Sequence, residues 1–178
     1  MDGDEQIASL RLIRTPNICP MTFSLLLQRY GSARAALDAV PELARRGGQS
    51  LKPAGRAAAT AEIEAVEAAG AKLLFKGGDD YPKALERFDD APPVLSARGT
   101  TALLSSPSIA VVGALARGTV AVIAGGIDIQ YPPENADLHD AIAKSCLLLA
   151  EMPPTHSQHR VISLFATVSS PALRSVFL

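Results

Sequence analysis

The stretch that decides the fold is TVAVIAGGIDIQYPPEN, at 119–135. Residues 119–124 are small, β-branched or apolar and carry no charge, which predicts a strand buried on both faces of a parallel sheet. Gly125-Gly126 follows directly and permits a sharp turn or the close approach of a backbone or a ligand. Pro132-Pro133-Glu134 then predicts the start of a helix. This order is typical of a phosphate-binding edge in an α/β sheet, but these residues alone favour an ordinary βα unit without a ligand, since Gly-Gly after a strand is common.

Length and composition allow either one domain or a small domain followed by a medium one. The chain has 178 residues and a net charge of −1, so bulk charge does not indicate a nucleic-acid partner. Aromatic residues make up 4% and there is no Trp, which leaves Ala, Leu, Val and Ile to build the core. Cys19 and Cys146 fit neither a zinc site nor a disulfide framework and are expected to be reduced. No signal sequence or membrane-length apolar run occurs, so a cytoplasmic protein without membrane association is expected.

Charge is distributed unevenly along the chain. No acidic residue occurs within 43–61, within 94–126 or after Glu151, although each of these stretches carries arginines. These arginines would line a basic face, or they would belong to a solvated surface with acids nearby in space.

Short helices are predicted for the first fifty residues. Apolar spacing, proline positions and glycine stops place them at 4–14, 20–30, 32–39 and 41–47. They predict a small helical module, of the sterile-alpha-motif or helix-hairpin-helix type, at 1–50. Modules of this type often hold DNA or protein partners, but short helices alone favour a purely structural role, so direct DNA contact is not expected here. Residues 51–72 read as a linker followed by a helix, and 73–178 as a sheet domain.

Four segments of the chain together resemble the DNA-processing protein A (DprA, or Smf) family. They are LLFKGGDDYPKALERFDDAPPVLSARG at 73–99, PSIAVVGA at 107–114, GGIDIQYPPEN at 125–135 and LLLAEMPP at 147–154. The YPPEN segment is the most specific, and the matches cover about half of the chain. The resemblance implies an α/β fold: a Rossmann-like parallel sheet domain preceded by the small helical module.

The spacing of two predicted strands conflicts with this fold. Residues 108–112 and 119–124 both read as buried parallel strands, yet a parallel crossover needs about a dozen residues and only 113–118 lie between them. Either the two strands form an antiparallel hairpin or a segment is missing. The resemblance implies that about fifty residues of βαβα pattern are absent after VVGA, which predicts a break at the Ala114–Leu115 junction.

The C-terminal stretch departs from the family pattern as well. Arg160, Ile162 and Ser163 match the end of a family segment whose other residues are missing, and 166–178 match no part of it. A second break is therefore expected between Met152 and Arg160. The chain is a longer protein with segments left out, a deleted or frameshifted relative, or a minimal variant. The first two are favoured because the breaks fall inside elements.

No catalytic constellation is predicted. The sequence contains no Walker A pattern and no G-x-G-x-x-G after a strand, so no nucleotide cofactor is expected. His156 and His159 are a weak metal pair, and no metal is predicted. For Asp128 and Glu134 a structural role is favoured, in which Asp128 bonds turn amides and Glu134 favours the helix start.

What remains is a candidate phosphate-binding site at the carboxyl ends of the buried strands. Backbone amides there would act with two arginines. The predicted DNA-binding residues are Gly113, Ala114, Arg117, Gly125, Gly126 and Arg160.

The resemblance also implies a function: binding of single-stranded DNA in natural transformation, loading of the RecA recombinase onto it, and homodimerisation, with no enzymatic activity. Only Gly113 and Ala114 remain of the family's first glycine-rich loop. The alternative is a nucleotide-processing enzyme of the lysine-decarboxylase-like or phosphoribohydrolase Rossmann type. Those enzymes carry a Pro-Gly-Gly-x-Gly-Thr loop, whereas AGGID at 124–128 lacks the Pro, the third glycine and the Thr.

Overall fold

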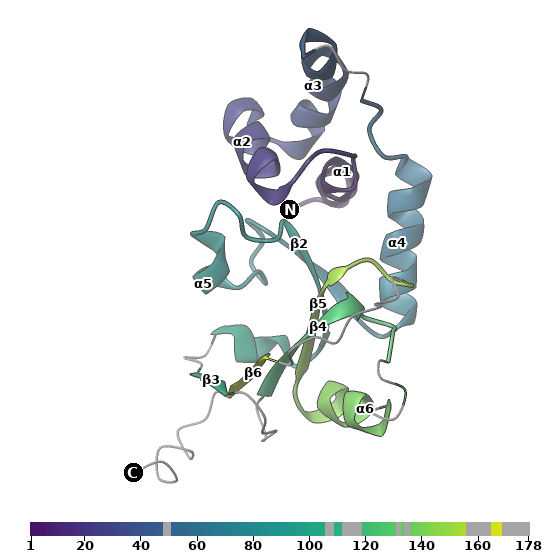
Figure 1. Ribbon diagram of the computed structural model, residues 1–178, viewed down its shortest axis with the longest axis vertical. Helices are drawn as coiled ribbons and strands as arrows, with labels where there is room; N and C mark the ends of the chain where they lie inside the picture. Colours follow the sequence, from purple (N-terminus) through teal and green to yellow (C-terminus); the bar gives the residue numbers. More distant parts are fainter. Residues whose placement is uncertain are drawn as a thin grey trace. The chain divides into compact units, whose positions relative to one another are not determined.

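The computed structural model divides into two compact units (Figure 1). The helical unit comprises Met1–Glu64 and Leu74–Val94, and the sheet unit comprises Ala65–Leu73 and Leu95–Leu178. The structure describes residues 1–47, 51–105, 109–111, 119–130, 133, 136–155 and 165–168, without the side chains of 109–111, 119, 124 and 165–168. The division at 1–50, 51–72 and 73–178 stays a prediction.

Three helices build the first part of the helical unit. They are α1 (Gly3–Ile13), α2 (Pro20–Tyr30) and α3 (Ala33–Arg46). Local signals set their ends: Glu5 N donates to Asp2 Oδ1 at 2.7 Å, and Ala35 N donates to Ser32 Oγ at 3.1 Å. Gly31 ends α2 with a φ of 78°, which glycine adopts without strain.

The prediction of two short helices around Pro41 is wrong, because α3 runs through that residue without a break. Pro41 lacks an N–H and so removes one intrahelical bond. The apolar face formed by Leu37, Val40 and Ala44 stays buried across the proline. This burial outweighs the lost bond and keeps the helix continuous.

The core of the helical unit lies where α1, α2 and α3 pack together. Its buried members include Leu12, Phe23 and Leu37. The α4 helix (Arg56–Ala68) begins in this unit, where Arg14 Nη2 lies 2.9 Å from Glu62 Oε1 in a mostly buried ion pair. The short helix α5 (Lys83–Glu86) follows, and nearby Tyr81 Oη donates to Pro92 O at 2.6 Å.

A six-stranded sheet is built in the order β1-β2-β5-β4-β6-β3. The strands are β1 (Lys72–Phe75), β2 (Val94–Gly99), β3 (Ile109–Val111), β4 (Thr119–Gly126), β5 (Leu147–Met152) and β6 (Phe165–Val168). A 3-10 helix, η1 (Thr101–Ser105), follows β2, and α6 (Ala136–Ser145) connects β4 to β5. The β4–β5 pair is parallel, whereas β2–β5, β4–β6 and β3–β6 are antiparallel. The fold class is thus confirmed as a helical module followed by an α/β domain, with a mixed sheet.

Of the two alternatives that the sequence allowed for β3 and β4, the structure contradicts the antiparallel hairpin. These strands are not paired as a hairpin, because β6 lies between them. Ile109 and Thr119 are both opposite Val168, and Val111 and Ala121 are both opposite Ala166. Since each is antiparallel to β6, β3 and β4 run in the same direction. The strand that separates them is β6, and its residues 166–168 belong to the stretch that matched no part of the family pattern.

The β4 strand is buried mainly on one face. Ala121 packs with Ile142 of α6 and Leu148 of β5 in the core of the sheet unit. On the other face Val120 is buried, but Val122 is 40% exposed. The expectation of burial on both faces is therefore wrong at Val122, because no described helix covers that position.

Candidate functional site

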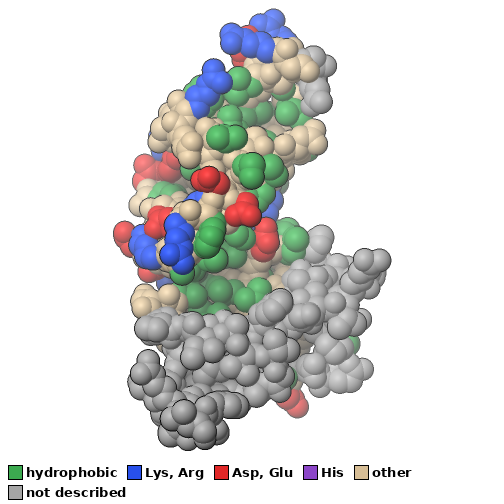
Figure 2. All heavy atoms as spheres, turned by 60° about the vertical axis from the view of Figure 1, so that its left-hand side comes forward, with side chains coloured by type: hydrophobic (Ala, Val, Ile, Leu, Met, Phe, Trp, Pro, Cys, Tyr) green, Lys and Arg blue, Asp and Glu red, His purple; other side chains and the backbone are tan. Residues whose placement is uncertain are grey.

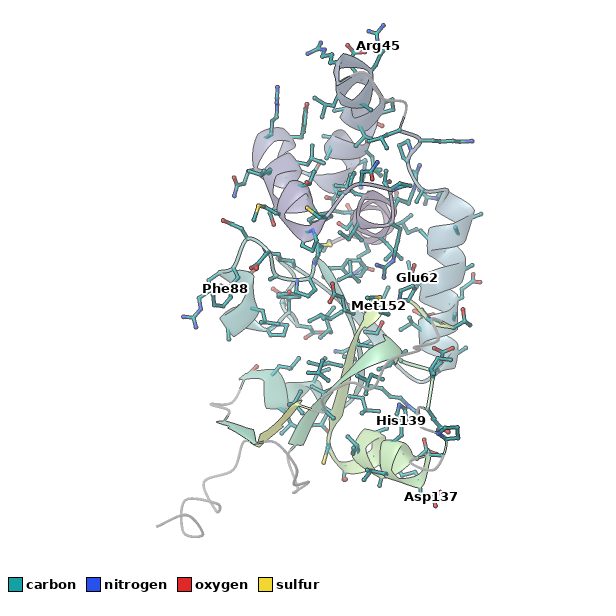
Figure 3. The ribbon with its side chains drawn as sticks, viewed as in Figure 1. Arg45, Glu62, Phe88, Asp137, His139 and Met152 are labelled. Carbon is teal, nitrogen blue, oxygen red and sulfur yellow. The ribbon has the colours of Figure 1, made fainter. Side chains whose placement is uncertain are left out.

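The carboxyl ends of three strands face one edge of the sheet. The β4 and β5 strands are parallel and end level with each other, since Gly126 is opposite Met152 (Figure 3 labels Met152). The β3 strand runs in the same direction as β4 because both are antiparallel to β6. In open α/β sheets ligands bind beyond such carboxyl ends. The predicted site residues either end one of these three strands, as Gly125 and Gly126 end β4, or follow one of them in sequence.

The structure places only part of the predicted site. Gly125 and Gly126 are the last two residues of β4, and both are buried. Gly113, Ala114, Arg117 and Arg160 lie outside the described residues, as does the Ala114–Leu115 junction.

Gly126 is packed tightly against its own chain. A Cβ atom there would lie 2.6 Å from Asp128 Oδ1, 2.6 Å from Pro153 O and 3.1 Å from Pro154 Cα. The expected close approach of a neighbouring backbone is thus confirmed. Glycine is required at this position by contact, since its φ is not in the left-handed region. The described contacts favour a structural role for Gly126 itself.

Asp128 ties the chain after β4 to the turn after β5. Thr155 N donates to Asp128 Oδ1 at 2.9 Å and to Oδ2 at 3.0 Å. The structural role expected for Asp128 is confirmed, although its partner is a distant amide rather than one of its own turn. Thr155 has a φ of 63°, which is unusual for a β-branched residue. The carboxylate therefore holds Thr155 in a conformation that it would rarely adopt alone.

A second polar cluster surrounds Asp140 on α6. Arg98 Nη1 lies 3.6 Å from Asp140 Oδ1, and Gln130 Nε2 donates to the same oxygen at 3.3 Å. No sequence pattern indicates this cluster beyond the absence of acids around Arg98, because its members come from β2, the loop after β4 and α6.

His139, beside this cluster, is buried without a hydrogen bond (Figure 3). Its Nδ1 lies 3.9 Å from Asp140 Oδ1, which is too long for a hydrogen bond. Burial, and then the nearby Arg98 cation, lower the pKa of His139 below its ordinary value, while Asp140 partly opposes this shift. The imidazole is thus held neutral at physiological pH, and it adds no positive charge to this side of the sheet.

A cavity of about 340 Å³ in the helical unit also carries arginines, but its charge is nearly balanced. Arg34 pairs with Asp2 at 3.2 Å, Arg56 pairs with Asp4 at 2.6 Å, and Arg11 Nε donates to Ala54 O at 2.7 Å. Hydrogen bonding and attraction to Arg56, with a smaller contribution from Arg34, lower the pKa of Asp4. Because its three arginines are already engaged by Asp2, Asp4 and the Ala54 carbonyl, the cavity does not present an anion site.

Other site chemistries find no support in the described part of the chain. No three His, Cys, Asp or Glu residues there are grouped to hold a metal ion. Cys146 is buried and Cys19 is exposed. Among the helices described, none has the length and apolar character needed to cross a membrane.

Comparison with family models matches both parts of the chain. Residues 3–65 match a model described as the DprA-like N-terminal HHH domain. Residues 72–117 and 114–163 match a model described as DNA recombination-mediator protein A. The two segments of the second match overlap at 114–117, around the Ala114–Leu115 junction, which supports the prediction that a family segment is missing there. A search of curated proteins found no match.

A solved structure shares the fold. The X-ray structure of DNA processing protein A (DprA) from Streptococcus pneumoniae aligns with a TM-score of 0.54 at 17% identity. The alignment covers 88% of this chain and 70% of that chain, and it supports the arrangement of a helical module before an α/β domain. Because the DNA recombination-mediator model alone spans more than half of the sequence, the chain belongs to the DprA/Smf family, whose role is DNA processing in transformation and recombination.

Proposed function

We propose that this chain binds single-stranded DNA in natural transformation and recombination and loads the RecA recombinase onto it. The observation that carries the proposal is the match of residues 72–163 to the DNA recombination-mediator family. On this proposal the protein is a DNA-binding mediator rather than an enzyme, and it acts as a homodimer in the cytoplasm.

The geometry of the sheet edge supports a DNA site there. Gly113 and Ala114 follow β3, Gly125 and Gly126 end β4, and Arg160 follows β5, while these three strands share one direction. Arg117 and Arg160 belong to stretches without acids and would supply charge for phosphates. Main-chain amides at the same edge would add hydrogen bonds to phosphate oxygens.

On this proposal Gly126 acts indirectly, by positioning the segment after β5 rather than by contacting DNA. Its missing side chain lets Pro153 approach, and Asp128 then fixes Thr155. Thr155 lies five residues before Arg160 in the chain. The contact between the loop after β4 and the turn after β5 would therefore direct the segment that carries Arg160 toward the bound DNA strand. The DNA phosphates would contact residues further along these segments rather than Gly126 itself.

The alternative enzyme is less well supported by the described contacts. A catalytic carboxylate beside the glycines would have to be Asp128 or Glu134. Both oxygens of Asp128 already accept hydrogen bonds from Thr155 N, so Asp128 is engaged in holding the chain. Glu134 lies outside the described residues.

The test is binding of a labelled oligonucleotide by the full chain at two salt concentrations. Affinity should fall with salt and depend little on base sequence, and each lost phosphate contact should reduce the log–log slope by about 0.7. Arg117→Ala and Arg160→Ala should each weaken binding. Arg45→Ala is the matched control, because Arg45 is exposed and pairs with Glu42 on α3.

Loading of RecA is measured separately. RecA filament assembly on the same oligonucleotide should be faster with the protein present, and Arg160→Ala should reduce that effect. An absence of DNA binding even at low salt would overturn the proposal. Binding that is unaffected by either arginine substitution would move the site away from this edge of the sheet.

A further inference from the structure

Besides Met1 at the start of the chain, three large apolar side chains are exposed among the described residues of the helical unit. They are Met21 and Leu25, one turn apart on α2, and Phe88, which follows α5; they are 53%, 59% and 51% exposed. We call these three residues the apolar patch. Scattered single apolar residues on a surface are ordinary, whereas a cluster of them marks an interaction site.

Hydrogen bonds bring the two segments of the apolar patch together. Ser24, which lies between Met21 and Leu25 in sequence, donates from Oγ to Asp89 O at 2.8 Å, across 65 residues of sequence. Lys76 Nζ donates to Ser24 Oγ at 3.2 Å and to Phe88 O at 2.6 Å. One ammonium group thus joins α2 to the backbone of Phe88. The three apolar side chains consequently flank a single fixed junction.

Phe88 is held in place although its ring is exposed (Figure 3). Its N–H donates to Leu85 O at 3.0 Å, and its carbonyl accepts from Ala91 N at 3.2 Å as well as from Lys76. The Arg87 guanidinium lies over the ring, 5.4 Å from its centroid. A partner would therefore meet an aromatic anchor that is already ordered, and binding would lose little conformational entropy.

Acidic side chains surround Phe88 in sequence and on the surface. The segment 79–90 contains five acids and only two basic residues, and Lys83 Nζ is paired with Glu86 at 3.0 Å. Asp79, Asp80, Asp89 and Asp90 are exposed. Figure 2 shows acidic side chains beside hydrophobic ones on the face that carries α2 and α5. Acids at these positions repel a phosphate backbone, and they also repel a second copy of the same surface.

We propose that the apolar patch, with its acidic surroundings, is a docking surface for a partner protein that presents an amphipathic helix with Lys and Arg beside its apolar face. Leu25 and Met21 supply adaptable apolar contacts, Phe88 supplies the anchor, and the exposed aspartates attract the basic side chains. Three anchor residues make a small interface, so the complex is transient. The apolar patch shares no residue with the proposed DNA site on the sheet edge.

The test uses the full chain and a synthetic helical peptide with leucines at i, i+3, i+4 and i+7 and lysines on the flanking positions. A second peptide has glutamates in place of the lysines. Binding is followed by fluorescence anisotropy at two salt concentrations. The lysine peptide should bind, the glutamate peptide should bind at least tenfold more weakly, and added salt should weaken the lysine peptide.

Variants then locate the contact. Phe88→Ser and Leu25→Ser should each weaken the lysine peptide at least tenfold, and the double variant Asp89→Asn/Asp90→Asn should weaken it and reduce its salt dependence. Leu138→Ser is the matched control, because Leu138 is an exposed apolar residue, 39% exposed, on α6 of the sheet unit. Thermal melting of every variant confirms folding, which is expected because the substituted side chains are exposed.

Several outcomes would overturn the docking surface. Equal binding of the two peptides, or unchanged binding by both Phe88→Ser and Leu25→Ser, would show only non-specific attraction. A loss of oligonucleotide binding in Phe88→Ser, with peptide binding intact, would assign the ring to nucleic acid. Concentration-dependent dimerisation that Leu25→Ser abolishes would identify a second copy as the occupant.

Discussion

At the residue scale, Gly126 and Asp128 together hold the turn after β5 against the end of β4. Gly126 leaves room for Pro153 O, and Asp128 accepts the N–H of Thr155. The two residues are neighbours in sequence, but the groups that they hold lie beyond β5. The second glycine of β4 therefore serves the contact between the loop after β4 and the turn after β5.

Gly126→Ala tests this contact. The added methyl group would lie 2.6 Å from a backbone oxygen, so the loop has to shift, and overpacking of this kind costs about 1–3 kcal/mol of unfolding free energy. Gly55→Ala is the control, because no atom lies within 4 Å of its added Cβ. Urea denaturation of both variants gives the comparison. Equal stability of Gly126→Ala and Gly55→Ala would show that the turn at 153–155 does not pack closely against Gly126.

His139 gives a second prediction, which concerns pH. Its pKa is lowered in the folded state by burial and by Arg98, with Asp140 in partial opposition. The unfolded chain therefore binds the proton first as pH falls through the ordinary value of about 6.5. Stability is full above that pH and decreases below it, down to the folded-state pKa. His139→Leu removes this titration, so the variant should lose less stability than the parent between pH 7 and pH 5 in urea denaturation.

The same substitution has a second readout above pH 7. Neither ring nitrogen of His139 has a hydrogen-bond partner, so leucine sacrifices no bond at this buried position. Above pH 7 the free energy of unfolding of His139→Leu should equal or exceed that of the parent. A large loss of stability above pH 7 would contradict this prediction and would indicate that a ring nitrogen makes a contact in solution.

At the element scale, sequence signals set the helix ends better than the strand partners. Pro20 and Gly31 delimit α2, and the prediction of 20–30 is met. The predictions fail where a non-local effect decides the outcome. Pro41 is a helix breaker by local propensity, yet packing of Val40 and Ala44 carries α3 past it. No local pattern foretells that 165–168 pair between β3 and β4.

In the candidate site, too, the sequence predicts the local features but not the contacts between distant segments. The strand and double glycine locate Gly125 and Gly126 at the end of β4 from sequence alone. The contact of Asp128 with Thr155 and the cluster around Asp140 join residues from separate elements, and periodicity cannot predict such contacts.

Pro41→Ala tests the continuity of α3. Alanine restores the missing N–H and removes a residue that costs up to about 3 kcal/mol inside a helix, while the more flexible unfolded chain offsets about 0.4–1 kcal/mol of that gain. The variant should be more stable in urea denaturation. If α3 were instead two helices broken at residue 41, the substitution would leave stability unchanged or lower it.

At the scale of the whole molecule, β6 holds the end of the sheet together. It is the described partner of β3, and it also covers the edge of β4. A sheet that loses such a strand exposes unpaired N–H and C=O groups on two others, which then pair with other chains.

A chain that ends at residue 164 tests this role. It should be less stable than the parent and should self-associate, as measured by denaturation and by sedimentation velocity. A chain that ends at residue 170 is the control, because it keeps β6. If both truncations stayed monomeric and equally stable, the pairing of β6 would contribute nothing to the sheet.

The topology of the sheet also has a kinetic consequence. The α1, α2 and α3 helices pack against one another within the first 46 residues, whereas the β2–β5 pair joins Ser96 to Ala150 and the β4–β6 pair joins Val120 to Thr167. Contacts that are distant in sequence close large loops and slow the folding of the segments that make them. During synthesis the three-helix core is completed while the ribosome is still adding the strands. The nascent sheet therefore spends longest with open edges, so chaperones would meet this protein mainly through its second half.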